Sequence, residues 1–167
     1  GLLWTIGLGG SFRAVSVNAV NAHGEAQIFG WMGLFVMGFA YQAFPRFWQS
    51  RLAAPGLAVV AFGLMVVGIV LRTLGLATAD GWGPGASLAL AGGLMEVAAV
   101  VLFAGQMVVT LRRSGAPLEP FIGFVLAALG WFVLSSGFSV WHSWRTTTAP
   151  SRDALLWALS TYQAPLR

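Results

Sequence analysis

Long uncharged runs, separated by short segments that contain proline and arginine, dominate the pattern of this chain. There are four runs in which Glu96 is the only charged residue: 26–44, 52–71, 81–111 and 120–141. An α-helix rises about 1.5 Å per residue, so about 20 apolar residues cross a hydrocarbon layer of about 30 Å. The pattern therefore predicts four membrane-spanning helices, at about 18–44, 53–72, 86–111 and 120–142.

The segments between these runs contain helix-breaking residues and are short, which favours antiparallel neighbours in an all-α polytopic transmembrane helical bundle. Residues 1–12 resemble the last turns of a further, partial helix. Within residues 146–167, the apolar stretch from Asp153 to Leu159 is too short to span, and we expect an interfacial segment there. We interpret residues 1–167 as a single transmembrane domain and as a fragment of a longer chain.

Composition supports a membrane protein and excludes several other classes. Of the 167 residues, 57% are hydrophobic and 8% are charged, against about 25% charged in ordinary soluble domains. The nine basic residues are all arginines, and they are spread over the turns rather than along one face, which argues against nucleic-acid binding. The absence of cysteine excludes disulfides and thiolate metal sites. No phosphate-binding loop, zinc-protease motif or Ser/His/Asp set occurs, so hydrolases and nucleotide-driven pumps are disfavoured.

The placement of arginine predicts an orientation in the membrane. Four arginines lie in two short loops on one side of the expected bundle: Arg46, Arg51, Arg112 and Arg113. The positive-inside rule favours the cytoplasm for these loops. We therefore expect an integral protein of a bacterial inner membrane, surrounded by lipid, with His23 and His142 toward the outer face.

His23 is the first candidate for chemistry, because neutral imidazole is a common protein ligand of haem iron and copper. Gly24, Gly30, Gly33 and Gly38 on the same helix leave room for a flat macrocycle or for a neighbouring helix. A histidine that only forms hydrogen bonds at the interface is the alternative. His142 closes the fourth run on the same side, and it either shares a metal with His23 or belongs to an interfacial girdle with Trp141 and Trp144.

Arg72 and Glu96 are the other two candidates. Arg72 ends the second run, where its guanidinium either pairs with a haem propionate or reaches the lipid headgroups. Glu96 lies near the middle of the membrane, where a carboxylate must be protonated, paired or hydrated. It serves as a proton relay or supports a ligand, or else it forms a hydrogen bond to Gln106, Ser135 or Ser136.

The stretch NAHGEAQIFGWMGLFVMGFAYQAFPRFW resembles the second-helix region of haem-copper oxidase subunit I-like proteins, and more closely that of the NnrS-like family of haem- and copper-containing membrane proteins. The likeness covers about 30 of the 167 residues. It consists of His23 followed by three segments: Ile28-Phe29-Gly30-Trp31, Gly38-Phe39-Ala40-Tyr41 and Phe44-Pro45-Arg46. The resemblance implies that His23 is an axial haem ligand near the outer face.

The chain also departs from that pattern. An oxidase needs several further histidines, whereas His142 is the only other one, and Asn21 stands where related sequences often have another histidine. From the resemblance we expect haem, with copper as a further metal, in electron transfer or nitric-oxide-related chemistry. A non-catalytic subunit that packs against other membrane subunits is the alternative, and a transporter with Glu96 as a proton-coupled site is a third.

Overall fold

The computed structural model describes residues 17–79, 81, 83–117 and 119–162, and these contain helices and no strand. The partial helix expected at residues 1–12 lies outside the described residues. The helices are α2 (Val17–Glu25), the π-helix η1 (Ala26–Gly33), α3 (Leu34–Phe47), α4 (Pro55–Thr78), α5 (Gly85–Ser114), α6 (Pro120–Thr147) and α7 (Arg152–Tyr162).

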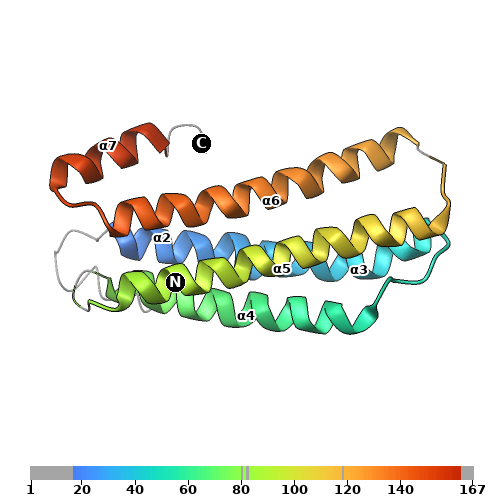
Figure 1. Ribbon diagram of the computed structural model, residues 1–167, viewed down its shortest axis with the longest axis horizontal. Coiled ribbons are helices and arrows are strands. Elements are labelled where there is room, and N and C mark those ends of the chain that lie inside the picture. Colours follow the sequence, from blue (N-terminus) through green and yellow to red (C-terminus); the bar gives the residue numbers. More distant parts are fainter. Residues whose placement is uncertain (1–16, 80, 82, 118, 163–167) are drawn as a thin grey trace.

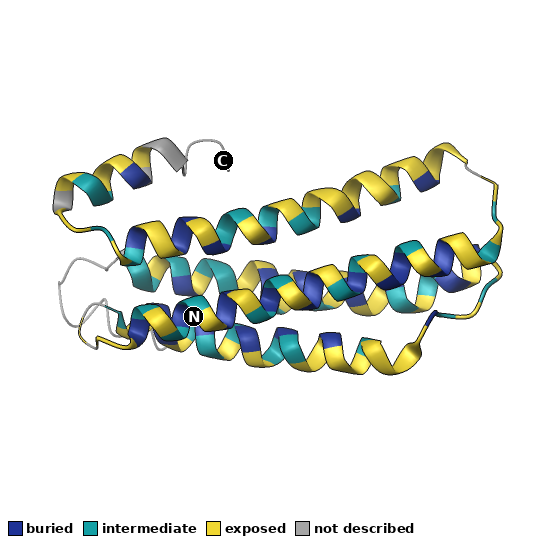
Figure 2. Ribbon diagram, viewed as in Figure 1, coloured by how far each residue is buried: buried dark blue, intermediate teal, exposed yellow. Residues whose placement is uncertain are grey.

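The four expected crossings are confirmed by helices of sufficient length and hydropathy. The segments α2, η1 and α3 join into one rod, which we call the first rod, and α4, α5 and α6 supply the other three spans. Successive spans run in opposite directions, and α7 packs against α6 (Figure 1). Exposed residues run along the outer faces of these helices (Figure 2), and many of them are large and apolar, which suits contact with lipid. The chain is thus an all-α bundle of the kind found in integral membrane proteins.

The helices end later than the sequence predicts, at Phe47, Thr78, Ser114 and Thr147. The sequence predicts ends at residues 44, 72, 111 and 142, each at or just before the next proline, arginine or histidine. In the structure the second and fourth spans continue past Arg72 and His142, and both side chains are buried within the bundle. Arg72 therefore lies in the helix interior rather than at its end, because α5 and α6 supply partners for its charge.

Helices α4 and α5 form the closest pair in the bundle, and glycine makes the approach possible. A Cβ atom added at Gly75 would lie 2.3 Å from the backbone nitrogen of Ala89, and one added at Gly92 would lie 2.4 Å from the backbone nitrogen of Arg72. Small residues allow membrane helices to pack in this way. By contrast, a Cβ at Gly24 or Gly38 of the first rod would meet nothing within 4 Å.

At the opposite end of α5, polar side chains hold the connection between α3 and α4 against the bundle. Thr110 accepts a hydrogen bond of 3.0 Å from the backbone N–H of Ala53, and the Gln106 amide donates to the carbonyls of Ala53 and Ala54 at 3.1 and 2.9 Å. The Tyr41 hydroxyl donates to Gln106 at 2.8 Å. These bonds satisfy backbone groups of a turn in which Ala54 has a φ of 47°.

The α3–α4 and α5–α6 connections lie at the same end of the bundle (Figure 1). The four arginines in or beside them are exposed: Arg46, Arg51, Arg112 and Arg113. The grouping that the sequence predicts is confirmed. The side of the membrane on which these loops lie stays a prediction.

Candidate functional site

Arg72 of α4 lies at the centre of a polar cluster inside the membrane-spanning region. Its side chain is 1% exposed, and Nη1 lies 2.6 Å from Oε2 of Glu96 on α5. Nη2 lies 3.1 Å from Oε1 of Glu25, the last residue of α2. The Glu96 side chain is also 1% exposed, whereas that of Glu25 is 16% exposed. One guanidinium therefore bridges two carboxylates from two different helices.

Two serines of α6 complete this arrangement, which we call the arginine cluster: Glu25, Arg72, Glu96, Ser139 and Ser143. Arg72 Nη2 donates to the hydroxyls of Ser139 and Ser143, each at 2.8 Å. The Ser139 hydroxyl donates in turn to Oε1 of Glu25. The first rod, α4, α5 and α6 thus meet at a single side chain.

Small residues and one aromatic ring shape the space around the guanidinium. A Cβ added at Gly93 would lie 2.7 Å from Val140 and 3.6 Å from Nε of Arg72, so glycine leaves room for the arginine side chain. The Phe29 ring of η1 has its centroid 6.0 Å from Cζ of Arg72. This is the outer range of a cation–π contact. The π-helical turns start directly after Glu25, and π-helical segments inside α-helices are frequent at functional sites.

The charges of the cluster do not cancel. With all three groups ionised, two carboxylates face one guanidinium, which leaves one net negative charge inside the membrane-spanning region. Three polar atoms of the cluster have no hydrogen-bond partner among the described residues, namely Glu25 Oε2, Arg72 Nε and Glu96 Oε1. Because an uncompensated charge away from water is costly, this arrangement favours the uptake of one positive charge.

The surroundings of Arg72 and Glu96 differ from the sequence-based interpretation. Arg72 reaches neither a headgroup nor the bundle surface, because four groups of its own chain surround it. Glu96 is deeply buried as expected, but the three predicted hydrogen-bond partners are engaged elsewhere. Gln106 bonds to Tyr41 and the α3–α4 connection, while Ser135 and Ser136 donate to carbonyls of their own helix.

The two histidines lie in contrasting environments. His23 is exposed on α2, whereas His142 of α6 is 7% exposed and its Nε2 has no hydrogen-bond partner among the described residues. His142 is adjacent in sequence to Ser143 of the arginine cluster. No group of three or more histidine, aspartate and glutamate side chains in the described ranges is arranged to hold a metal ion.

Sequence reasoning missed the pairing of Glu25 with Arg72. A usable signal was present, because charges inside membrane spans are paired with one another as a rule. Glu25, Arg72 and Glu96 lie within α2, α4 and α5, the three helices that the structure brings together here. Because the predicted second helix ends at Arg72, this arginine was assigned to the membrane boundary and not considered as a partner for a carboxylate within the bundle.

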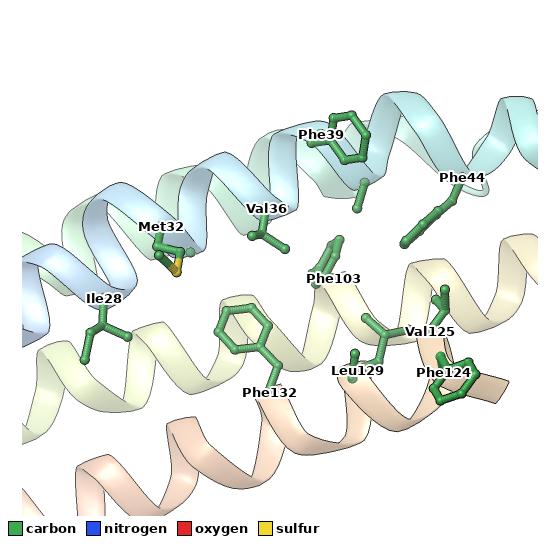
Figure 3. A pocket seen from close by; sticks show the side chains of 13 residues that line it. Ile28, Met32, Val36, Phe39, Phe44, Phe103, Phe124, Val125, Leu129 and Phe132 are labelled. Atoms are coloured by element: carbon green, nitrogen blue, oxygen red, sulfur yellow. The ribbon is translucent and has the colours of Figure 1, made fainter. Parts of the chain in front are cut away.

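A second feature is a wholly apolar groove between the first rod and α6. It has a volume of about 480 Å³, and Phe103 of α5 lies at its base (Figure 3). Met32, Val36 and Phe39 line one wall, and Phe124 and Ala128 belong to the other. Figure 1 shows α6 diverging from the first rod toward the end where α6 begins. The two walls therefore stand apart where the groove lies.

No protein-family model, no curated protein and no solved structure matches this chain. The four spans, the arginine cluster, the groove and the two histidines are therefore the observations from which function is inferred.

Proposed function

We propose that this chain is a membrane-embedded redox protein that offers the His23 imidazole as an axial ligand to haem. The supporting observation is an outward-facing row on the first rod that begins with His23. Gln27, Trp31 and Phe35 follow it at intervals of four residues, and all four are exposed. The rings of Trp31 and Phe35 stack with centroids 6.4 Å apart, so these two side chains lie on the same side of the rod.

The fit of haem to this row rests on His23 and its immediate surroundings. An imidazole nitrogen is a suitable iron ligand, and a Cβ at neighbouring Gly24 would meet nothing within 4 Å, which leaves space for a planar group. Bound haem would supply one-electron chemistry, including reactions of nitric oxide. Arg72 has no part in the proposal, because its guanidinium is enclosed by the arginine cluster. The second face of the haem site would come from outside the described residues.

The two histidines give a matched test of this proposal. Purified protein reconstituted with haem is expected to show a Soret band with the signature of histidine ligation. The His23→Ala variant should lose at least tenfold in haem affinity, because the iron–nitrogen bond is removed, whereas His142→Ala should retain it. Absorption titration with haem measures both. Equal affinity in wild type and His23→Ala, or a loss confined to His142→Ala, would contradict the proposal.

A non-catalytic membrane subunit is the second candidate function, and the apolar groove favours it. Thirteen residues from η1, α3, α5 and α6 line the groove, and all of them are apolar. A transmembrane helix from another subunit would bury these side chains between the first rod and α6. Shape and van der Waals contact drive such association in lipid, where the hydrophobic effect between helices is weak.

Adjacent alanines on α6 test this second candidate. Ala128 lines the groove and Ala127 does not, although both are exposed. Ala128→Trp should fill the groove and weaken association with a partner subunit at least tenfold, a loss of about 1.4 kcal/mol. Ala127→Trp should leave association unchanged. The measurement is the size of the complex extracted from native membranes in mild detergent, and an unchanged size with both variants would exclude a partner in this groove.

A further inference from the structure

We propose that the arginine cluster is a proton-binding site, in which Glu96 takes up one proton from solution and releases it again. The ligand is a single proton, and the change at the site is the conversion of the Glu96 carboxylate to the carboxylic acid. No haem is needed for this, and His23 is not one of the groups of the cluster.

The first step of the argument is the charge count across the four helices that meet at the site. Glu25 comes from α2, Arg72 from α4 and Glu96 from α5, while α6 contributes two neutral hydroxyls and the buried imidazole of His142. Among the described residues, Arg72 is the only positive charge in an ion pair with these two carboxylates, since Arg112, Arg113 and Arg145 at the ends of α5 and α6 are exposed. One added proton makes the site neutral, and neutrality is strongly favoured where water is excluded.

The second step assigns the proton to Glu96 rather than to Glu25. Oε1 of Glu25 accepts a hydrogen bond from the Ser139 hydroxyl and forms an ion pair with Arg72, and its side chain keeps 16% exposure. Glu96 receives a single donor, Arg72, and has 1% exposure. Donated hydrogen bonds and contact with solvent both favour the ionised form of a carboxylate. Glu96, whose side chain is the more deeply buried, is therefore the carboxyl group that takes up the proton.

The third step concerns the atom that receives the proton. Oε2 of Glu96 accepts the bond from Arg72, while its Oε1 is buried and has no hydrogen-bond partner among the described residues. Protonation at Oε1 leaves the Arg72 bond in place, because a carbonyl oxygen also accepts. The exchange therefore leaves the contacts that hold α4 to α5 intact.

His142 is the competing site for the proton, since its Nε2 is buried and has no described partner. Protonation there would place a second positive charge beside the site, since the next residue, Ser143, accepts a hydrogen bond from Arg72. Like charges close together in a poorly hydrated region repel strongly. Glu96 is therefore the favoured acceptor within the site.

Infrared spectroscopy of the full chain in lipid tests the proposal directly. At neutral pH we expect a carboxylic-acid C=O band that shifts when the protein is made with ¹³C-glutamate and that fades as pH rises. The chain contains only three glutamates, Glu25, Glu96 and the exposed Glu119. Glu119→Gln is the matched control and should leave the band unchanged, whereas Glu96→Gln should abolish it.

Glu96→Asp is a second variant that tests the proposal if Glu96→Gln does not fold. It keeps an acid at this position but carries no ¹³C label in protein made with labelled glutamate, so the band should lose its isotope shift. Absence of a glutamic-acid band in the wild type would overturn the proposal, and it is the outcome expected if His142 takes the proton. A band that keeps its isotope shift in Glu96→Asp would place the proton on Glu25 and would also overturn it.

Discussion

Replacement of Arg72 by leucine is expected to reduce the free energy of unfolding by about 3–5 kcal/mol, because it leaves the buried carboxyl groups of Glu25 and Glu96 without the guanidinium that both contact. That loss is a large part of the 5–15 kcal/mol by which folded proteins are usually stable. The hydroxyls of Ser139 and Ser143 would lose their donor as well. We therefore expect the variant to unfold at much lower temperature or to fail to accumulate.

Two further variants identify the cause of this loss. Arg145 lies in the last turn of α6 and is exposed, so Arg145→Leu should change stability by no more than about 0.5 kcal/mol. Arg72→Leu combined with Glu96→Leu should be more stable than Arg72→Leu alone, because the deeper carboxylate is then removed together with its partner. Denaturant or thermal unfolding in detergent measures all three. Arg72→Leu as stable as Arg145→Leu would show that the cluster contributes little to the fold.

The second large effect is expected at the contact between α4 and α5. Gly75→Ala should destabilise the bundle by about 1–3 kcal/mol, because the added methyl group would meet the backbone of Ala89 at 2.3 Å and the two helices would have to separate. Backbone cannot move aside as a flexible side chain can. Gly92→Ala should act in the same way, since its methyl group would meet the backbone nitrogen of Arg72 at 2.4 Å.

Glycines on the same two helices serve as controls for this effect. A Cβ added at Gly63 of α4 or at Gly105 of α5 would meet nothing within 4 Å. Alanine at these positions should be neutral or stabilising by up to about 1 kcal/mol, because alanine has the higher helix propensity. Thermal unfolding of the four single variants in one detergent gives the comparison. Similar melting temperatures for Gly75→Ala and Gly63→Ala would contradict the close approach of α4 and α5.

The number of spans and their alternating direction were predictable because the hydrophobic length of a helix is a local property. An uncharged run such as 52–71 is long enough to cross the bilayer whatever lies next to it. Short connections then require neighbouring helices to run antiparallel. The same reasoning correctly grouped the exposed arginines of two connections at one end of the bundle. It also placed Glu96 deep in a span, where the structure finds it 1% exposed.

The environment of each candidate residue was not predictable in this way, because it depends on which helix faces meet. Arg72 was expected near a propionate or the headgroups, yet Gly92 and Gly93 draw α5 close to it and bring Glu96 within 2.6 Å of its guanidinium. For the same reason, the second span ends later in the structure, at Thr78, than the sequence predicts. A charge with partners inside the bundle does not need to end a helix.

By itself, the sequence determined that this chain has four helical segments long and apolar enough to cross a membrane, and that a carboxylate lies within one of them. Both follow from hydrophobicity and helical rise along a single segment. Only the tertiary structure decided that Glu25, Arg72 and Glu96 form one cluster, that His142 is buried while His23 faces outward, and that an apolar groove separates α6 from the first rod. These features arise from packing between segments that lie far apart in the chain. The pattern of residues along a single segment does not specify which faces of the helices pack together.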